Sequence, residues 1–430
     1  MKVEKMNCGD GIEFSVLRTD KFKNDILVVN FLMPKTEKNI AVGNLLSKMF
    51  LRGTEKHSTN LGINRVLAGL YDASVSVAHI ALPDAMCFRL SCNFVDDRFI
   101  PDGDRTSVLS GVISMIKEML EFPLTDENGN WKEEYIQSEK SNLLDELRAQ
   151  KNNKDSFALR RFSEIWHEGM SMALNSGGTE DSITEVTSAD LNGYLGEMKK
   201  TAPADVVFAG NYTAFKEEKC LEFIKFLSGL RSGCKTNYIN AVPEIAAAEK
   251  LKEVREETDA KQSRMLLGYR IDKSGASRYA RSVFCEIFGG SPTSRLFTNV
   301  RERLSLCYYC SATYSESTGE LTVRSGLDAE TRDKAADEIA RQLKLLADAE
   351  NISSGELEAA KKGLVNMYKS INDNVYAYSS WYLSSKLCGL DTDIDNYVSG
   401  VCEVTAEQVA VVASAVKQEI SYILVGNVKK

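Results

Sequence analysis

The stretch that decides the fold is DVVFAGN at residues 205–211, because its pattern returns as SYILVGN at residues 421–427. A second repeat, EVT, occurs at residues 185–187 and again at 403–405. The two offsets, 216 and 218 residues, are nearly the same. In each copy the Thr fits a helix N-cap, and an apolar strand that ends in Gly-Asn follows the helix. The repeats therefore indicate two homologous halves of roughly 200 residues each.

Outward from these repeats, both halves combine apolar strands with amphipathic helices. Several strands follow one another directly in the sequence, which favours antiparallel pairing over a doubly wound sheet. We predict an α+β fold of two homologous domains, each an antiparallel-rich β-sheet covered by α-helices. The strands are expected at 12–17, 26–33, 73–81, 85–94, 265–270, 307–314 and 319–325, and the main helices at 40–51, 64–70, 108–122, 131–150, 276–288, 332–347 and 354–387.

The predicted domain boundaries follow the repeats and the composition. Residues 1–230 form the first domain, 231–260 a linker, and 261–430 the second domain. The segment 246–261 is rich in Ala, Glu and Lys and has few large apolar residues. We interpret it as an exposed linker that is helical in part.

Composition excludes several classes of function. Hydrophobic residues make up 43% of the chain and charged residues 27%, which is typical of a globular protein. The net charge is −8 and no long basic run occurs, so neither a dedicated nucleic-acid binder nor a binder of anionic membranes is expected. The sequence contains no run of 18 apolar residues that could span a membrane. The first residues lack the apolar core of a secretory signal, so we expect a cytoplasmic protein with reduced thiols.

Metal-binding and phosphate-binding motifs are weak or absent. The three histidines, His57, His79 and His167, have spacings that fit no short metal motif. Cys307 and Cys310 form one C-x-x-C pair without a second. The aromatic residues between them favour a strand with the two side chains on opposite faces, so we favour a structural role over a metal or redox role. The Gly-Gly-Ser-Pro segment at 289–292 is no phosphate loop; we favour a helix end over a mobile peptide-contacting loop.

Several motifs resemble the pitrilysin/insulinase-type zinc peptidases. The first is NLLSK at residues 44–48 with Arg-Gly-Thr at 52–54, where active members of that family carry H-x-x-E-H and a basic-Gly-Thr tail. The resemblance continues over nearly the whole chain and implies a two-half architecture. The other matching segments are LYDAS at 70–74, EKSNLLDE at 139–146, FGG at 288–290, SRLF at 294–297 and VRE at 300–302, and the match extends to Tyr308.

The zinc-binding residues of the family are replaced in this chain. In H-x-x-E-H, two His one helical turn apart bind Zn²⁺ and the Glu activates water. Here the corresponding residues are Asn44, Ser47 and Lys48. The Lys ammonium has only donors and would oppose a divalent cation. By the resemblance, Glu146 stands at the third-ligand position and Glu139 at the supporting acid. One carboxylate is too few for a catalytic zinc site, so no cofactor is expected.

Two further hypotheses concern single side chains. Lys48 is expected either to pair with Glu146, with Glu139 as a second candidate partner, or to point to solvent. The resemblance implies that Arg301 and Tyr308 contact substrate, because an Arg and a Tyr at this spacing steady the peptide in active relatives. The alternative is a structural ion pair of Arg301 with Glu302 and a packed Tyr308.

The resemblance implies a catalytically inactive subunit that encloses peptide together with a homologous zinc-bearing partner. That family often works as such a heterodimer. Two alternatives remain open at this point. One is an active zinc-dependent endopeptidase with a non-standard site, and the other is a scaffold or assembly subunit without peptide contact.

Overall fold

The computed structural model describes residues 2–101, 107–234, 245, 248, 250–390 and 393–427. The chain forms two compact units that exchange segments between the halves of the sequence. The first unit consists of Met1–Ala149, Leu174–Ala241 and Asn372–Leu390. The second consists of Gln150–Ala173, Val242–Ile371 and Asp391–Lys430. Each unit therefore contains one segment that comes from the other half of the chain.

The first unit contains a six-stranded mixed sheet in the order β1-β2-β6-β3-β5-β4. Strands β2 and β6 run parallel, and the other neighbours are antiparallel. The strands are β1 (Lys2–Asn7), β2 (Ile12–Arg18), β3 (Asn24–Pro34), β4 (Ser74–Ala81), β5 (Ala85–Val95) and β6 (Ala204–Gly210).

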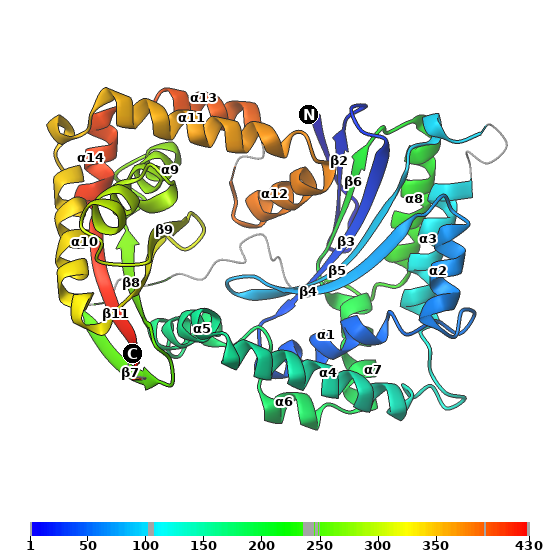
Figure 1. Cartoon of the computed structure of the whole chain (residues 1–430). Coiled ribbons are helices and arrows are strands. Elements are labelled where there is room, and N and C mark those ends of the chain that lie inside the picture. Colours follow the sequence, from blue (N-terminus) through cyan, green and yellow to red (C-terminus); the bar gives the residue numbers. More distant parts are fainter. Residues whose placement is uncertain are drawn as a thin grey trace. The chain divides into compact units, whose positions relative to one another are not determined.

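Helices cover both faces of this sheet (Figure 1). Side chains of a strand alternate between the two faces of its sheet. On one face, Phe31 and Met33 of β3 pack into the large core beneath seven helices. On the opposite face, Leu32 contacts Leu383 and Leu387. Those two leucines belong to α12 (Val375–Leu387), which comes from the second half of the sequence. The other helices are α1 (Glu37–Met49), α2 (Asn60–Ala68), α3 (Ser107–Glu121), α4 (Glu133–Asn152), α6 (Glu180–Glu185), α7 (Ser188–Thr201) and α8 (Ala214–Gly229).

The second unit contains a five-stranded sheet in the order β7-β11-β8-β10-β9. Strands β7 and β11 run parallel, and the others are antiparallel. Met265 and Leu267 of β8 enter the main core of this unit, while Leu266 packs on the other face against α5 (Lys154–Trp166). The strands are β7 (Lys252–Thr258), β8 (Ser263–Ile271), β9 (Tyr309–Ser315), β10 (Glu320–Leu327) and β11 (Val416–Gly426); the other helices are α9 (Arg278–Cys285), α10 (Arg332–Leu346), α11 (Ser354–Ile371), α13 (Ile394–Cys402) and α14 (Ala406–Ser414).

The two sheets have the same topology, which confirms the predicted α+β class. The order β2-β6-β3-β5-β4 in the first unit matches β7-β11-β8-β10-β9 in the second, including the single parallel pair. The repeated Thr187 and Thr405 cap α7 and α14, and each forms a capping box. The repeated apolar stretches are β6 and the end of β11.

The segment 246–261 differs from the expected partly helical linker. Residues Lys252–Thr258 form β7, which occupies the place that β2 has in the first sheet. Its sequence, KEVREET, contains many charged residues. These are tolerated because β7 is an edge strand whose side chains are largely exposed. Residues 235–244, 246, 247 and 249 of the expected linker region lie outside the described residues.

The expected single helix over 354–387 is also wrong. The structure ends α11 at Ile371 and begins α12 at Val375. Asn374 makes this break, since its side chain accepts hydrogen bonds from the backbone N–H groups of Tyr376 and Ala377. Asn153 caps α5 in the same way. The two exchanged helices thus begin at equivalent Asn caps. Within the described residues, no helix has the length and apolar character needed to cross a membrane.

Candidate degenerate metal site

Helix α1 carries the three positions of the degenerate zinc motif in the first unit. Thr36 caps the helix by accepting a hydrogen bond from the N–H of Asn39. The helix is buried on most of its circumference, and Asn44 and Ser47 are among its buried residues. Polar groups in such a place need hydrogen-bond partners.

Asn44 and His79 are hydrogen-bonded to one another. The Asn44 amide Nδ2 donates to the carbonyl O of Ser176 at 2.9 Å, so its Oδ1 is free to accept from His79 Nδ1 at 2.9 Å. The hydroxyl of Tyr194 then donates to His79 Nε2 at 3.1 Å. Burial lowers the pKa of His79 to about 3, which keeps the ring neutral as this pattern requires. A Cβ on Gly43 would lie 2.3 Å from the His79 ring, so only glycine fits there.

The position of the catalytic Glu is also occupied by an internally bonded group. The Ser47 hydroxyl donates to the Asn44 carbonyl O, in the preceding turn of α1, at 2.7 Å. Such a hydroxyl is no general base at neutral pH, and here its proton is already donated to the backbone.

Lys48 pairs with Glu146 of α4 and not with Glu139. The Lys48 Nζ lies 2.8 Å from Glu146 Oε1, and the two side chains are 38% and 55% exposed. Glu139 is buried, and Arg52 Nε donates to its Oε1 at 2.5 Å. Asn142 donates to the other Glu139 oxygen. Arg52 of the Arg-Gly-Thr tail thus binds Glu139, while Glu146, expected at the third-ligand position, faces an ammonium.

The side chains at these positions do not fit a zinc ion. A zinc site needs nitrogen, sulfur or carboxylate donors with lone pairs directed at the metal. The Asn44 oxygen accepts from His79, Ser47 donates to the backbone, and the Glu146 carboxylate binds a cation that belongs to the protein. Among the described residues no group of three His, Cys, Asp or Glu side chains could hold a metal ion.

The two ion pairs of this site should differ in their contribution to stability. Because the Lys48–Glu146 pair is largely exposed, we expect Lys48→Met to lower the free energy of unfolding by less than about 1 kcal/mol. Arg52→Met leaves the buried Glu139 carboxylate with one donor, so we expect a loss of roughly 1–3 kcal/mol. Urea denaturation of both variants measures the difference. Equal losses would contradict this ranking.

Arg301 and Tyr308 lie in the second unit and are both accessible. The Arg301 side chain is 39% exposed, and its guanidinium lies 4.6 Å from the Phe297 ring centroid. It also forms the ion pair with Glu302 that the sequence suggested as an alternative, at 3.6 Å. Tyr308 is 46% exposed, and its hydroxyl donates to Asp328 at 3.1 Å. Arg301 sits on a π-helical segment, Leu296–Arg303, a geometry often found at functional positions.

Gly289 and Gly290, which precede this π-helical segment, end a helix, as the sequence favoured. Residues Glu286–Gly290 continue α9 as a π-helical turn that Ser291 ends. A Cβ on Gly289 would lie 2.6 Å from the Ala312 Cβ, so glycine here permits close approach of the turn to β9.

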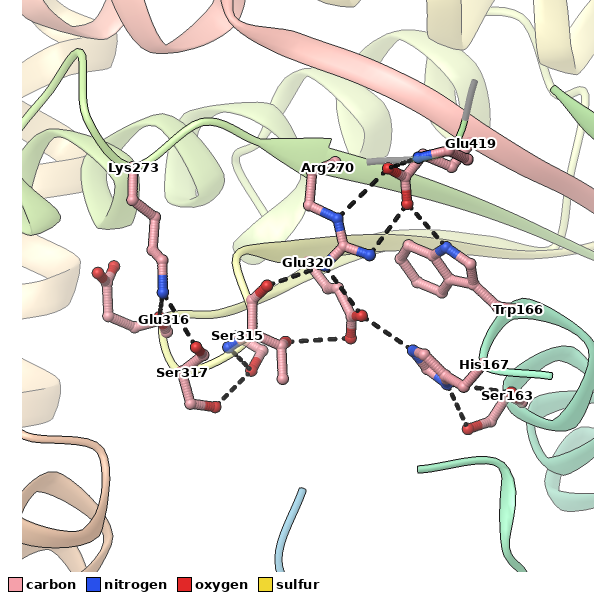
Figure 2. Close-up of polar contacts among 12 residues, drawn as sticks. Ser163, Trp166, His167, Arg270, Lys273, Ser315, Glu316, Ser317, Glu320 and Glu419 are labelled. Carbon is pink, nitrogen blue, oxygen red and sulfur yellow. Dashed lines mark hydrogen bonds and ion pairs between the residues drawn. The ribbon is translucent and has the colours of Figure 1, made fainter. Parts of the chain in front are cut away.

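A buried polar cluster that sequence reasoning missed attaches α5 to the second sheet (Figure 2). Arg270 of β8 bridges Glu320 at 3.2 Å and Glu419 at 3.0 Å. Trp166 Nε1 also donates to Glu419, and His167 Nε2 lies 2.9 Å from Glu320. The only sequence signal was a His beside a Trp on a charged helix.

This cluster contains a Ser, a His and a Glu but does not form a nucleophilic triad. His167 Nδ1 faces both the carbonyl O and the hydroxyl of Ser163, at 3.0 and 3.2 Å, while Nε2 faces Glu320 at 2.9 Å. The Ser163 hydroxyl also has a backbone acceptor in the Met172 carbonyl O at 3.5 Å. His167 and Glu320 are buried, which is consistent with a structural role.

Comparison with known proteins agrees with this degenerate site. Residues 185–364 match the family Peptidase M16 inactive domain. The chain is 23% identical over 421 residues to the "Probable inactive metalloprotease YmfF" of Bacillus subtilis, covering 97% of this chain and 96% of that protein. This chain is similar to inactive members of the M16 peptidase family. M16 is the pitrilysin/insulinase-type family that the motifs of the first half resemble.

Two solved structures extend this likeness over the full length of the chain. A conserved protein from Enterococcus faecalis V583 superposes with a TM-score of 0.87 at 25% identity, covering 100% of this chain and 99% of that one. The peptidase M16 inactive domain from Pseudomonas fluorescens gives 0.79 at 17% identity, with both chains fully covered, and supports the fold alone. The predicted resemblance to inactive members of this family is confirmed.

Proposed function

We propose that this M16-like protein is a non-catalytic subunit that holds peptide together with a zinc-bearing partner of similar size. The observation that carries the proposal is the contrast between its two candidate sites. The metal-site positions are occupied by a bonded amide, a bonded hydroxyl and an ammonium paired with Glu146. Arg301 and Tyr308 are instead both exposed at the surface of the second unit, where Arg301 pairs with Glu302 and Tyr308 with Asp328.

Peptide contact is supported by the chemistry of these exposed groups. A guanidinium offers a planar fork of donors and a phenol offers one more, which suits peptide carbonyl groups. In the described part of the first unit, β4 pairs only with β5, so its outer edge is not paired with another strand. An extended peptide adds to such an edge through main-chain hydrogen bonds. The β4 edge lies beside α1, since His79 of β4 bonds Asn44.

A partner is supported by the chemistry that this chain lacks. Members of the M16 family often work as paired subunits, and a chain without zinc ligands has a role in peptide processing when another chain supplies the metal. We further propose a cytoplasmic, heterodimeric protein without a resident cofactor. All ten cysteines are free thiols, which suits a reducing compartment.

The experiment is affinity capture of the full chain from its native cell, followed by peptidase assay of the captured complex. We expect a co-purifying chain with H-x-x-E-H and activity that requires both chains. In the reconstituted pair, Arg301→Ala should raise KM for peptide about tenfold, because a charge-assisted hydrogen bond is lost. Arg341→Ala is the matched control, since Arg341 is a similarly exposed arginine of the same unit that pairs with Glu338.

Each alternative function has its own result in this experiment. Chelator-sensitive hydrolysis of peptides by the purified chain alone would support the active endopeptidase and contradict the proposal. A captured partner whose KM is the same with Arg301→Ala and with Arg341→Ala would support a scaffold without peptide contact.

A further inference from the structure

Cys307 and Cys310 lie on the same side of the chain, contrary to the expectation from the sequence. A continuous strand would direct residues three apart to opposite faces. However, β9 begins only at Tyr309, and the backbone bends at Tyr308 after Ser305, which has a left-handed φ of 49°. Cys310 belongs to the core of the second unit, and Cys307 packs against that same core. The bend thus brings the two thiols together.

The two sulfur atoms share their neighbours. The two thiols interact electrostatically with one another and with Ser325, whose hydroxyl donates to the Tyr309 carbonyl O at 3.0 Å. Ser325 stands directly opposite Cys310 in the pairing of β10 with β9. Cys307 is partly exposed and Cys310 is buried. This arrangement places an accessible thiol in front of a protected one.

The surroundings make the two thiols unequal in reactivity. The interaction with the Cys310 thiol, together with the positive charge of Arg301, lowers the pKa of Cys307 to about 7 against the effect of burial. The same contact, together with burial, raises the pKa of Cys310 well above its usual value. A thiolate is the attacking species in disulfide exchange, and a thiol that can later resolve the mixed disulfide is its usual partner.

We propose that Cys307 and Cys310 form a redox-active dithiol that closes reversibly to a disulfide by exchange with a low-molecular-weight disulfide. The Cys307 thiolate attacks one sulfur of the small disulfide, forms a mixed disulfide and releases one small thiolate. Cys310 then loses its proton and attacks the Cys307 sulfur, which releases the second small thiolate. The protein dithiol loses two electrons and two protons, and the small disulfide gains both to become two thiols.

The inference goes beyond the proposed function and does not rest on it. A zinc site at this pair is disfavoured because the described residues supply no third ligand. The disulfide would enclose Tyr308, whose N–H donates to the Gly326 carbonyl O at 2.7 Å. Redox state would therefore set the geometry of one of the two exposed residues discussed above.

The test uses a single tryptic peptide of the intact, folded chain. Residues 304–324 follow Arg303, end at Arg324, contain no other Lys or Arg, and hold Cys307 and Cys310 alone. The chain is incubated in glutathione buffers from fully reduced to mostly oxidised, quenched in acid, alkylated and digested. We expect this peptide to lose two hydrogens in the oxidised buffers and to regain them after transfer to the reduced buffer.

Cys8 serves as the control within the same digest. It is partly exposed like Cys307, burial raises its pKa, and it is the only cysteine in the tryptic peptide 6–18. At pH 7 we expect Cys307 to react at least roughly fivefold faster than Cys8, after allowance for the lower nucleophilicity of a low-pKa thiolate. Cys8 should stop at a mixed disulfide.

Two variants test the order of the steps. Cys310→Ser should accumulate glutathione on Cys307, and Cys307→Ser should leave Cys310 unreacted over the same time. Arg301→Ala should move the midpoint of the pH profile of the Cys307 reaction upward. The wild-type measurement decides the proposal even if Cys310→Ser does not fold. A 304–324 peptide that stays fully reduced, or that carries only mixed disulfide while Cys8 reacts equally fast, would overturn it.

Discussion

Lys216→Met is expected to lower the free energy of unfolding by about 3–5 kcal/mol, because removal of one member of a buried ion cluster leaves uncompensated charge. The Lys216 side chain is fully buried. Its Nζ lies 2.5 Å from Asp25 Oδ2, 3.0 Å from Asp96 Oδ1 and 3.8 Å from Asp97 Oδ2. Methionine retains most of the side-chain volume, so the lower free energy of unfolding would come from the missing charge and not from a cavity.

The loss should depend on pH through Asp25. Burial raises the pKa of Asp25 to about 6, although Lys216 opposes the shift. Without the ammonium this pKa rises further, so the folded variant binds a proton that the unfolded chain releases near pH 4. Stability of the variant therefore falls as pH rises from about 4 through 6 and beyond. The deficit relative to wild type should be larger at pH 8 than at pH 5.

The measurement is urea denaturation of both proteins at these two pH values, followed by circular dichroism. Lys219→Met is the matched control, because Lys219 lies three residues further along α8 and pairs with Glu222 at the surface. We expect the control to match wild type at both pH values. A deficit for Lys216→Met no larger than that of the control would contradict the prediction.

The Gly-Asn end of the repeat belongs to this ion cluster. A Cβ on Gly210 would lie 1.9 Å from the Asp25 carboxylate, and the Asn211 N–H donates to that carboxylate at 2.9 Å. In the second copy, Asn427 donates to the Thr258 carbonyl O instead. The sequence therefore predicts the strand end in both halves, but only the tertiary structure reveals that one copy supports a buried Lys.

Elements with strong local patterns could be predicted from the sequence, whereas those determined by tertiary contacts could not. The buried strands β3, β5 and β6 are rich in apolar residues, and their bounds agree with expectation within a few residues. Strand β7 was missed because an edge strand with charged residues resembles a linker in composition. Helix α12 was merged with α11 because the exchange of helices between units leaves no compositional trace.

The same limit applies to the candidate site. The spacing of the motif was sufficient to suggest the pair of Lys48 with Glu146, since both positions follow from the family pattern. His79 could not be connected with Asn44, because they lie 35 residues apart on different elements. The assignment of Glu139 as a second partner of Lys48 failed because Arg52, one turn further along, takes that carboxylate.

Restoration of the motif by Asn44→His, Ser47→Glu and Lys48→His together should create a zinc site with a Kd below about 1 µM. Imidazoles at positions 44 and 48 lie one turn apart on α1, and the Glu146 carboxylate already reaches position 48 through Lys48. These are the three protein ligands that a catalytic zinc site requires. Competition against a chromophoric zinc chelator measures the affinity, and thermal unfolding with and without zinc confirms that the folded chain binds.

Two quadruple variants test which carboxylate faces the motif. Addition of Glu146→Gln to the triple variant should weaken zinc binding at least tenfold, because one of three ligands is lost. Addition of Glu139→Gln should change the affinity little, since that carboxylate is bound by Arg52 and Asn142 rather than directed at position 48. If Glu139→Gln abolished binding and Glu146→Gln did not, the two acids would have to exchange roles. The geometry around Lys48 would then no longer explain why the present side chains do not fit a zinc ion.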